Sequence, residues 1–79
     1  MVRLSQAKKR VKYIIQHVDG DSESLSRLNK LGFYPGQTVT LKRKAPLFGN
    51  PMLFQIEHGQ YALTKNEAAL VEVAEADTE

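Results

Sequence analysis

The stretch Leu31 to Val39, LGFYPGQTV, is the first candidate for chemistry, because closely spaced glycines can form a loop that binds phosphate. Such a loop reads G-x-x-x-x-G-K-[ST] or G-x-G-x-x-G, follows a strand and opens a helix. Here the pattern before Gly32 is helical, the next glycine is Gly36, and no lysine follows it. The stretch therefore predicts a hinge between a helix and a strand.

Metal-binding and catalytic patterns are also incomplete. His17 and His58 fall at the ends of expected strands, and nothing in their spacing supplies the three or four converging ligands of a metal site. The segment DGDSE begins like a calcium loop, but Ser24 and Lys30 occupy the positions that require glycine and glutamate. The chain has no cysteine and no G-x-S-x-G nucleophile motif. We therefore expect neither an enzyme nor a bound cofactor or metal.

The hinge implies a helix before it. Turn-forming residues follow a strand-like segment, VKYIIQHV, and Asp21 or Ser22 can cap a helix there. Leucines at three-residue spacing then predict a helix over residues 22–31 that ends at Gly32. Pro35 and Gly36 are the central pair of an expected type II turn.

Short strands dominate the rest of the chain. Apolar residues alternate with polar ones after the hinge, again over residues 52–56, and again around Tyr61. Thr64 and Glu67 form a capping box that predicts one helical turn, and a last short strand follows it. Five short strands and one or two short helices predict a mainly β fold, a small SH3-like β-barrel. We expect one domain over residues 1–74 and a disordered acidic tail over residues 75–79.

Charge suggests a binding role. The chain has 79 residues and a net charge of +2, but its cations gather in two clusters, one over residues 8–12 and one at Lys42, Arg43 and Lys44. Such clusters indicate an anionic partner or an acidic protein surface, although solvated strand ends also explain each cluster alone. No apolar run approaches the ~20 residues of a membrane span, so a soluble protein is expected.

Two aromatic residues could dock a partner. Tyr34 and Phe48 lie in expected loops beside proline, where a large apolar side chain is difficult to bury. Exposed aromatics beside cations can contact a protein or stack on nucleic-acid bases. The alternative is that both side chains fold inward and plug the barrel.

The order of these motifs resembles the FeoA family of bacterial ferrous-iron transport. The resemblance covers about residues 3–74 and rests on the segments LGFYPGQTV, LKRKAPLFGNP and YALTKNEAALVEV. The positions that match the family's pattern are Leu31, Gly32, Pro35, Gly36, Pro46, Gly49, Pro51, Leu63, Lys65, Glu67 and Ala68, and Thr64 completes the expected structural motif with Glu67. Asn50 stands where the family commonly has aspartate, and the start of the chain is more basic.

The resemblance implies a function that spacing alone does not. It implies a cytoplasmic, non-enzymatic accessory protein that binds the GTPase region of the iron permease FeoB and reaches the membrane only through that partner. The residues expected at the partner surface are Leu25, Tyr34, Lys42, Arg43, Lys44, Leu47, Phe48 and Met52.

Two other classes remain open. A small barrel with basic clusters can bind nucleic acid with strong salt dependence, although the modest net charge and acidic tail argue against it. A similar barrel also forms the C-terminal domain of iron-dependent repressors, but the chain has no room for their helix-turn-helix domain.

Overall fold

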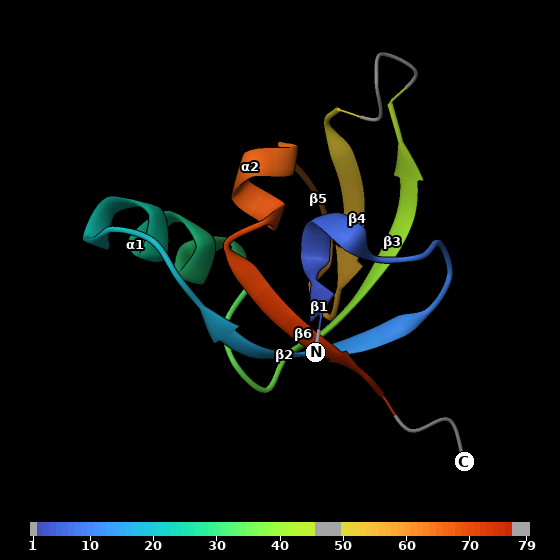
Figure 1. Cartoon of the computed structure of the whole chain (residues 1–79), viewed down its shortest axis with the longest axis horizontal. Helices are drawn as coiled ribbons and strands as arrows, with labels where there is room; N and C mark the ends of the chain where they lie inside the picture. The colour runs from blue at the N-terminus through green and yellow to red at the C-terminus, as the bar shows by residue number, and fades with distance from the viewer. Residues whose placement is uncertain (1, 46–49, 77–79) are drawn as a thin grey trace.

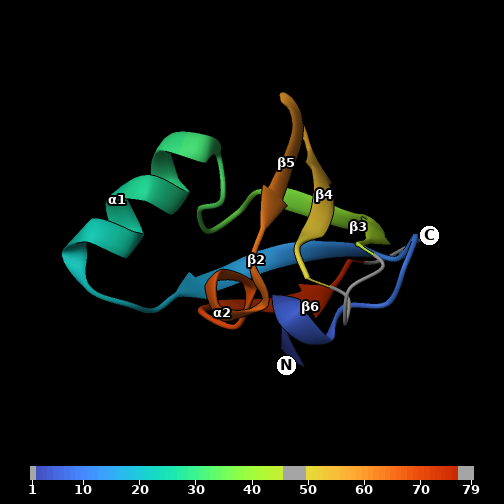
Figure 2. The same ribbon diagram turned by 90° about the horizontal axis from the view of Figure 1, so that it is seen from above.

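The computed structural model describes residues 2–45 and 50–76. Its elements in chain order are β1 (Val2–Arg3), the 3-10 helix η1 (Leu4–Gln6), β2 (Lys12–Val18), α1 (Ser22–Leu31), β3 (Thr38–Lys44), β4 (Met52–Ile56), β5 (Gly59–Leu63), α2 (Lys65–Ala68) and β6 (Val71–Glu75). All pairings between these strands are antiparallel, in the order β1-β6-β2-β3-β4-β5. The sheet curls so that the β4–β5 hairpin stands across β2 and β6 (Figures 1 and 2).

The core fills the inside of the curled sheet. Alternate residues of each strand point inward, as in β4, where Met52, Phe54 and Ile56 are buried. Phe33, which follows α1, meets the rings of Phe54 and Tyr61 edge to face. The chain after α1 is therefore tied to the hairpin by aromatic packing.

A β-bulge alters the alternation in β3. Leu41 faces Phe54 across the ladder and Arg43 faces Leu53, so Lys42 is the extra residue. Without the bulge, Arg43 would lie opposite Met52, whose side chain points into the core. The extra residue thus directs Arg43 to the outer face of the sheet.

Helix α1 begins and ends where the sequence predicts. Asp21 is its N-cap and accepts a hydrogen bond from the Ser24 amide at 2.9 Å. Gly32 ends the helix with φ of +109°, a left-handed conformation that a side chain disfavours. Of the leucine stripe, Leu28 is buried, Leu31 half-buried and Leu25 exposed, so the helix packs on the sheet along its C-terminal half.

The fold class is confirmed, with two corrections to the predicted sheet. The described residues form six strands, because Val2–Arg3 adds a short edge strand beside β6. The predicted barrel is not closed, since no ladder joins β5 to β1 within residues 2–45 and 50–76. The reason is local: β1 turns at once into η1 after two residues, and β5 runs directly into the capped turn of α2.

The last strand and its hydrogen bonds continue past residue 74, and the domain bounds themselves stay a prediction. Strand β6 continues to Glu75, and the Ala76 amide donates a hydrogen bond to the Lys12 carbonyl at 2.9 Å. Residues 77–79 of the expected tail lie outside the described residues.

Candidate partner-binding surface

A shallow pocket separates α1 from the turn that follows it. The pocket has a volume of about 250 Å³ and brings together Leu25 and Tyr34, which come from different elements. Each of these side chains is 38% exposed. The full lining is His17, Val18, Leu25, Asn29, Phe33, Tyr34 and Pro35. The structure therefore assembles two of the predicted partner residues at one site.

The turn beside this pocket has the predicted form. The Gln37 amide donates to the Tyr34 carbonyl at 3.1 Å, and Gly36 has φ of +94°, as the second central residue of a type II turn requires. The buried Gln37 side chain also donates to the Tyr34 hydroxyl at 3.1 Å. Tyr34 is thus held at the surface, and the alternative of an inward plug does not apply to it.

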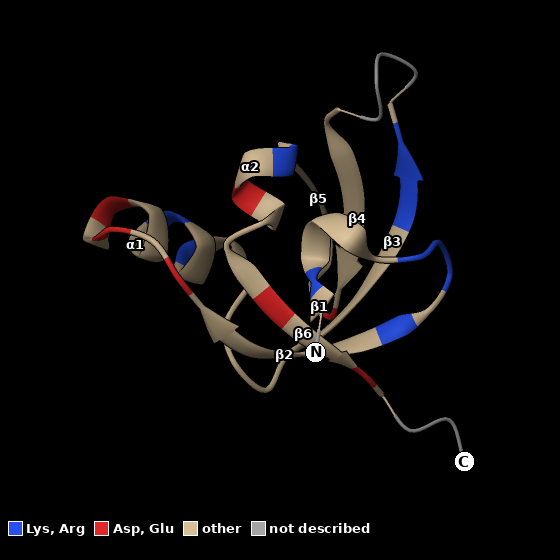
Figure 3. Cartoon of the chain, viewed as in Figure 1, with Lys and Arg blue, Asp and Glu red and all other residues tan. Residues whose placement is uncertain are grey.

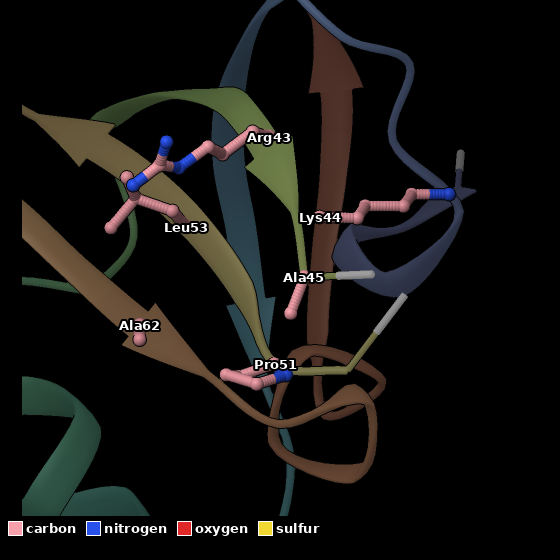
Figure 4. Close-up of a pocket in the computed structure, with 6 residues that line it drawn as sticks. All are labelled: Arg43, Lys44, Ala45, Pro51, Leu53 and Ala62. Atoms are coloured by element: carbon pink, nitrogen blue, oxygen red, sulfur yellow. The ribbon is translucent and has the colours of Figure 1, made fainter. Parts of the chain in front are cut away.

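The second candidate surface lies at the far end of β3. Lys42, Arg43 and Lys44 are all exposed there. A pocket of about 490 Å³ is lined by Arg43, Lys44, Ala45, Pro51, Leu53 and Ala62 (Figure 4). The Arg43 side chain lies along Leu53, whereas Lys44 points away from it toward the N-terminal segment (Figure 4). Cations and aliphatic groups therefore share this end of the sheet.

The two basic clusters of the sequence lie together in the structure. A parallel bridge pairs Lys9 with Leu41, and the Arg10 amide donates to the Leu41 carbonyl at 3.0 Å. Lys12 lies opposite Thr40 in the β2–β3 ladder. We call the resulting surface the basic end: Lys8, Lys9, Arg10, Lys12, Lys42, Arg43 and Lys44, all exposed (Figure 3). Each cluster is evident separately in the sequence, which carries no signal of the bridge that joins them.

Met52 is a correction among the predicted partner residues. Its side chain is 0% exposed, because it points inward from the start of β4 and joins the core. The prediction of Met52 as a surface contact was wrong. Leu47 and Phe48, together with Pro46 and Gly49, lie outside the described residues.

The structural motif residues that are described hold the surfaces in place. Thr64 accepts from the Glu67 amide at 3.1 Å and its own amide donates to the Glu67 carboxylate at 3.0 Å, as the capping box predicts. Glu67 also pairs with Arg27 of α1, which ties the two helices together. Pro51 immediately precedes β4 and lines the pocket beside Arg43 and Lys44.

Asn50 has a role that the sequence did not reveal. Its side-chain oxygen accepts a hydrogen bond from the Lys65 amide at 3.0 Å. This amide is in the first turn of α2 and has no partner within the helix. The side chain thus joins the end of the β3–β4 connection to α2. The only sign of this contact in the sequence is that the first amide of a helix capped by Thr64 needs a hydrogen-bond partner.

Acidic groups with shifted pKa values lie away from the basic end. The Arg3 guanidinium donates to Asp19 at 2.7 Å and lowers the pKa of this carboxyl, with a smaller contribution from His17 at 2.9 Å. Hydrogen bonds from Ser24 lower the pKa of Asp21. Both carboxylates therefore remain ionised at neutral pH and leave α1 with an acidic N-terminal side.

Two kinds of feature are absent from the described part of the chain. Residues 2–45 and 50–76 contain no group of three or more histidine, aspartate or glutamate side chains that could hold a metal ion. Within the same residues, no helix has the length and apolar character needed to cross a bilayer.

Known structures place this arrangement in a class and then in a family. The curled sheet with its added helix is an SH3-like domain. The zinc-bound FeoA of Stenotrophomonas maltophilia, which is 28% identical, is likewise an SH3 domain protein, and it is described as a possible bacterial ferrous iron transport activating factor. That match has a TM-score of 0.80 and covers 94% of this chain and 91% of the other. The FeoA domain profile matches residues 2–75, so the chain belongs to the FeoA family.

Other similar structures agree with this fold. Iron(II) transport protein A from Clostridium thermocellum is 30% identical with a TM-score of 0.88 over 94% of this chain, which spans 45% of that protein. The manganese regulator SloR, 13% identical, shares the fold alone, with a TM-score of 0.79 over 95% of this chain and 34% of its own. No curated protein sequence matches the chain significantly.

Proposed function

We propose that this protein is an accessory component of bacterial ferrous iron uptake that binds the cytoplasmic GTPase region of the permease FeoB. The pocket between α1 and the Tyr34 turn is the contact, with Leu25 and Tyr34 as its apolar anchors. The observation that carries the proposal is membership of the FeoA family over residues 2–75, together with this pocket. The protein acts by binding and carries out no chemical step.

The exposed aromatic and aliphatic side chains of the pocket support a protein partner. Interfaces concentrate their binding energy in a few aromatic and aliphatic anchors that become buried on contact. Tyr34 meets this description, since the residue is 38% exposed and its hydroxyl is already bonded to Gln37. A rigid, exposed ring loses little side-chain freedom when a partner covers it.

The basic end lies at the other end of the sheet from α1 (Figures 1 and 3). We therefore assign the GTPase contact to the pocket and give the cations of the basic end a role of their own.

The test is a titration of the isotope-labelled protein with the FeoB GTPase domain of the same organism, monitored by NMR chemical shifts. Shifts confined to α1 and the Tyr34 turn are expected. Leu25→Ala and Tyr34→Ala should each weaken binding by about tenfold or more, as loss of an interface anchor does.

Two variants serve as controls. Val2→Ala truncates a side chain of matching exposure, 39%, on β1, outside the pocket, and should leave affinity unchanged. Tyr34→Phe keeps the ring and removes only the bond from Gln37, so it should retain most of the binding. If Val2→Ala weakens binding as much as Leu25→Ala, the pocket is not the contact.

A further inference from the structure

The charges of the molecule are divided between its two ends. Seven of its 11 cations form the basic end, whereas the other four are interspersed with the acids near α1, α2 and β1 (Figure 3). One acid, Glu75, lines a pocket with Lys8, but the ion pairs of the described residues involve Arg3, His17 and Arg27, and none includes a cation of the basic end. Like charges that outnumber their counter-charges repel one another, and an anionic partner would lower that cost.

The width of the basic end indicates what kind of anion fits. Lys12 lies opposite Thr40, and Lys44 is four residues farther along β3, which corresponds to roughly 13 Å at the usual rise of a strand. The cations come from both sides of β3, since Lys44 points toward the N-terminal segment and Arg43 toward Leu53 (Figure 4). This arrangement is too broad for one phosphate group and matches a surface that carries many.

The groups between the cations distinguish a lipid surface from a nucleic acid. Ala45, Pro51 and Leu53 line the pocket beside Arg43 and Lys44. Among the described aromatics only Tyr34 is exposed, and it lies at the pocket of α1, so the described residues of the basic end present no ring on which a base could stack. Cations with aliphatic neighbours suit the headgroup region of a bilayer, where charge meets phosphate and short apolar groups meet the acyl boundary.

We infer that the basic end binds anionic phospholipid headgroups directly and orients the domain on a membrane with α1 and its pocket facing away. The acids near α1 favour the same orientation, because a negative surface repels them. This contact does not depend on the proposed GTPase partner.

The test measures sedimentation of the full-length protein with lipid vesicles. We expect binding to vesicles that contain phosphatidylglycerol and none to pure phosphatidylcholine, with binding that weakens as salt rises above about 0.15 M. Each basic residue near an anionic surface strengthens partition by about fivefold. The double variant Lys42→Gln with Lys44→Gln should therefore reduce partition by about 25-fold.

Two further variants test the geometry. Lys8→Gln with Lys9→Gln, in the other segment, should cause a loss of similar size, because the bridge at Lys9 puts both segments on one surface. Arg27→Gln with Lys30→Gln removes the same net charge from α1, at the other end, and should change partition by less than about twofold. All these side chains are exposed, so circular dichroism should show an unchanged fold.

Three results would overturn the inference. One is an equal loss of vesicle binding in the basic-end variants and in the control variant at the other end, which would mean that net charge alone drives binding. Another is no binding to phosphatidylglycerol vesicles at physiological salt. The third is tighter binding to a single-stranded RNA with the same dependence on Lys42 and Lys44, which would assign the surface to nucleic acid. Since the vesicles contain no protein, none of these results bears on the FeoB proposal.

Discussion

Replacement of Gly32 by alanine should destabilise the domain through two separable effects. The first is conformational, because Gly32 has φ of +109° and a side chain in the left-handed region costs about 1–2 kcal/mol. The second is steric, because an added Cβ would lie 2.6 Å from Cδ1 of Ile56, which is buried. Overpacking of this kind costs about 1–3 kcal/mol. We expect a total loss of roughly 2–5 kcal/mol.

Gly36 provides a matched control for the backbone effect. Its φ is +94°, but an added Cβ would meet nothing within 4 Å. Gly36→Ala should therefore cost about 1–2 kcal/mol, all of it conformational. The difference between the two variants, at least about 1 kcal/mol, isolates the contact with Ile56.

Urea unfolding followed by far-ultraviolet circular dichroism measures these free energies. In thermal melts, Gly32→Ala should lower Tm by about 8 °C or more, since 1 kcal/mol corresponds to about 4–8 °C in a domain of this size. Ile56→Val removes the atom at the point of contact and should couple favourably with Gly32→Ala by at least about 0.5 kcal/mol. Equal losses for the two glycine variants, with no coupling to Ile56, would refute the steric argument.

Three other substitutions test the supports of the fold by thermal or urea unfolding. Leu28→Ala should cost about 2–5 kcal/mol, because Leu28 is the one fully buried residue of α1, and a loss near zero would mean that the helix is not anchored there. Thr64→Ala should cost about 1 kcal/mol by removing the cap of α2, and Thr64→Ser should largely retain it. Asp19 has a lowered pKa, so its contribution is present above its unfolded pKa of about 3.9 and is lost as pH falls through its folded value. Asp19→Asn should therefore flatten the decline of Tm below about pH 4, and an unchanged decline would contradict the role of Arg3.

Local signals predicted the helices and their ends. Asp21, Gly32, Thr64 and the Pro35–Gly36 pair each satisfy or shape the backbone within a few residues, so their effect can be read without knowledge of distant contacts. The sheet-forming segments after the hinge were also predicted, since their alternation reflects one buried face.

Features that depend on distant segments could not be predicted in the same way. Met52 was expected at the partner surface, and its burial depends on the residues from other elements that pack against it in the core. Glu23 stands four residues before Arg27 in a helix-favouring order, yet Arg27 pairs with Glu67 from another element. The basic end likewise requires the bridge between Lys9 and Leu41, which joins segments about 30 residues apart.

The β-bulge in β3 has a consequence for how this chain can vary in length. Because Lys42 is the extra residue, any side chain that tolerates solvent can replace it, and its deletion would leave Arg43 opposite Leu53 and Lys44 opposite Met52 in a regular ladder. Deletion of Leu41 would instead bring Lys42 opposite Phe54, whose side chain is buried, and burying an unpaired ammonium group is costly. Loss of Lys42 should thus be far better tolerated than loss of Leu41, so that natural variants of this segment can differ by one residue in length at the bulge.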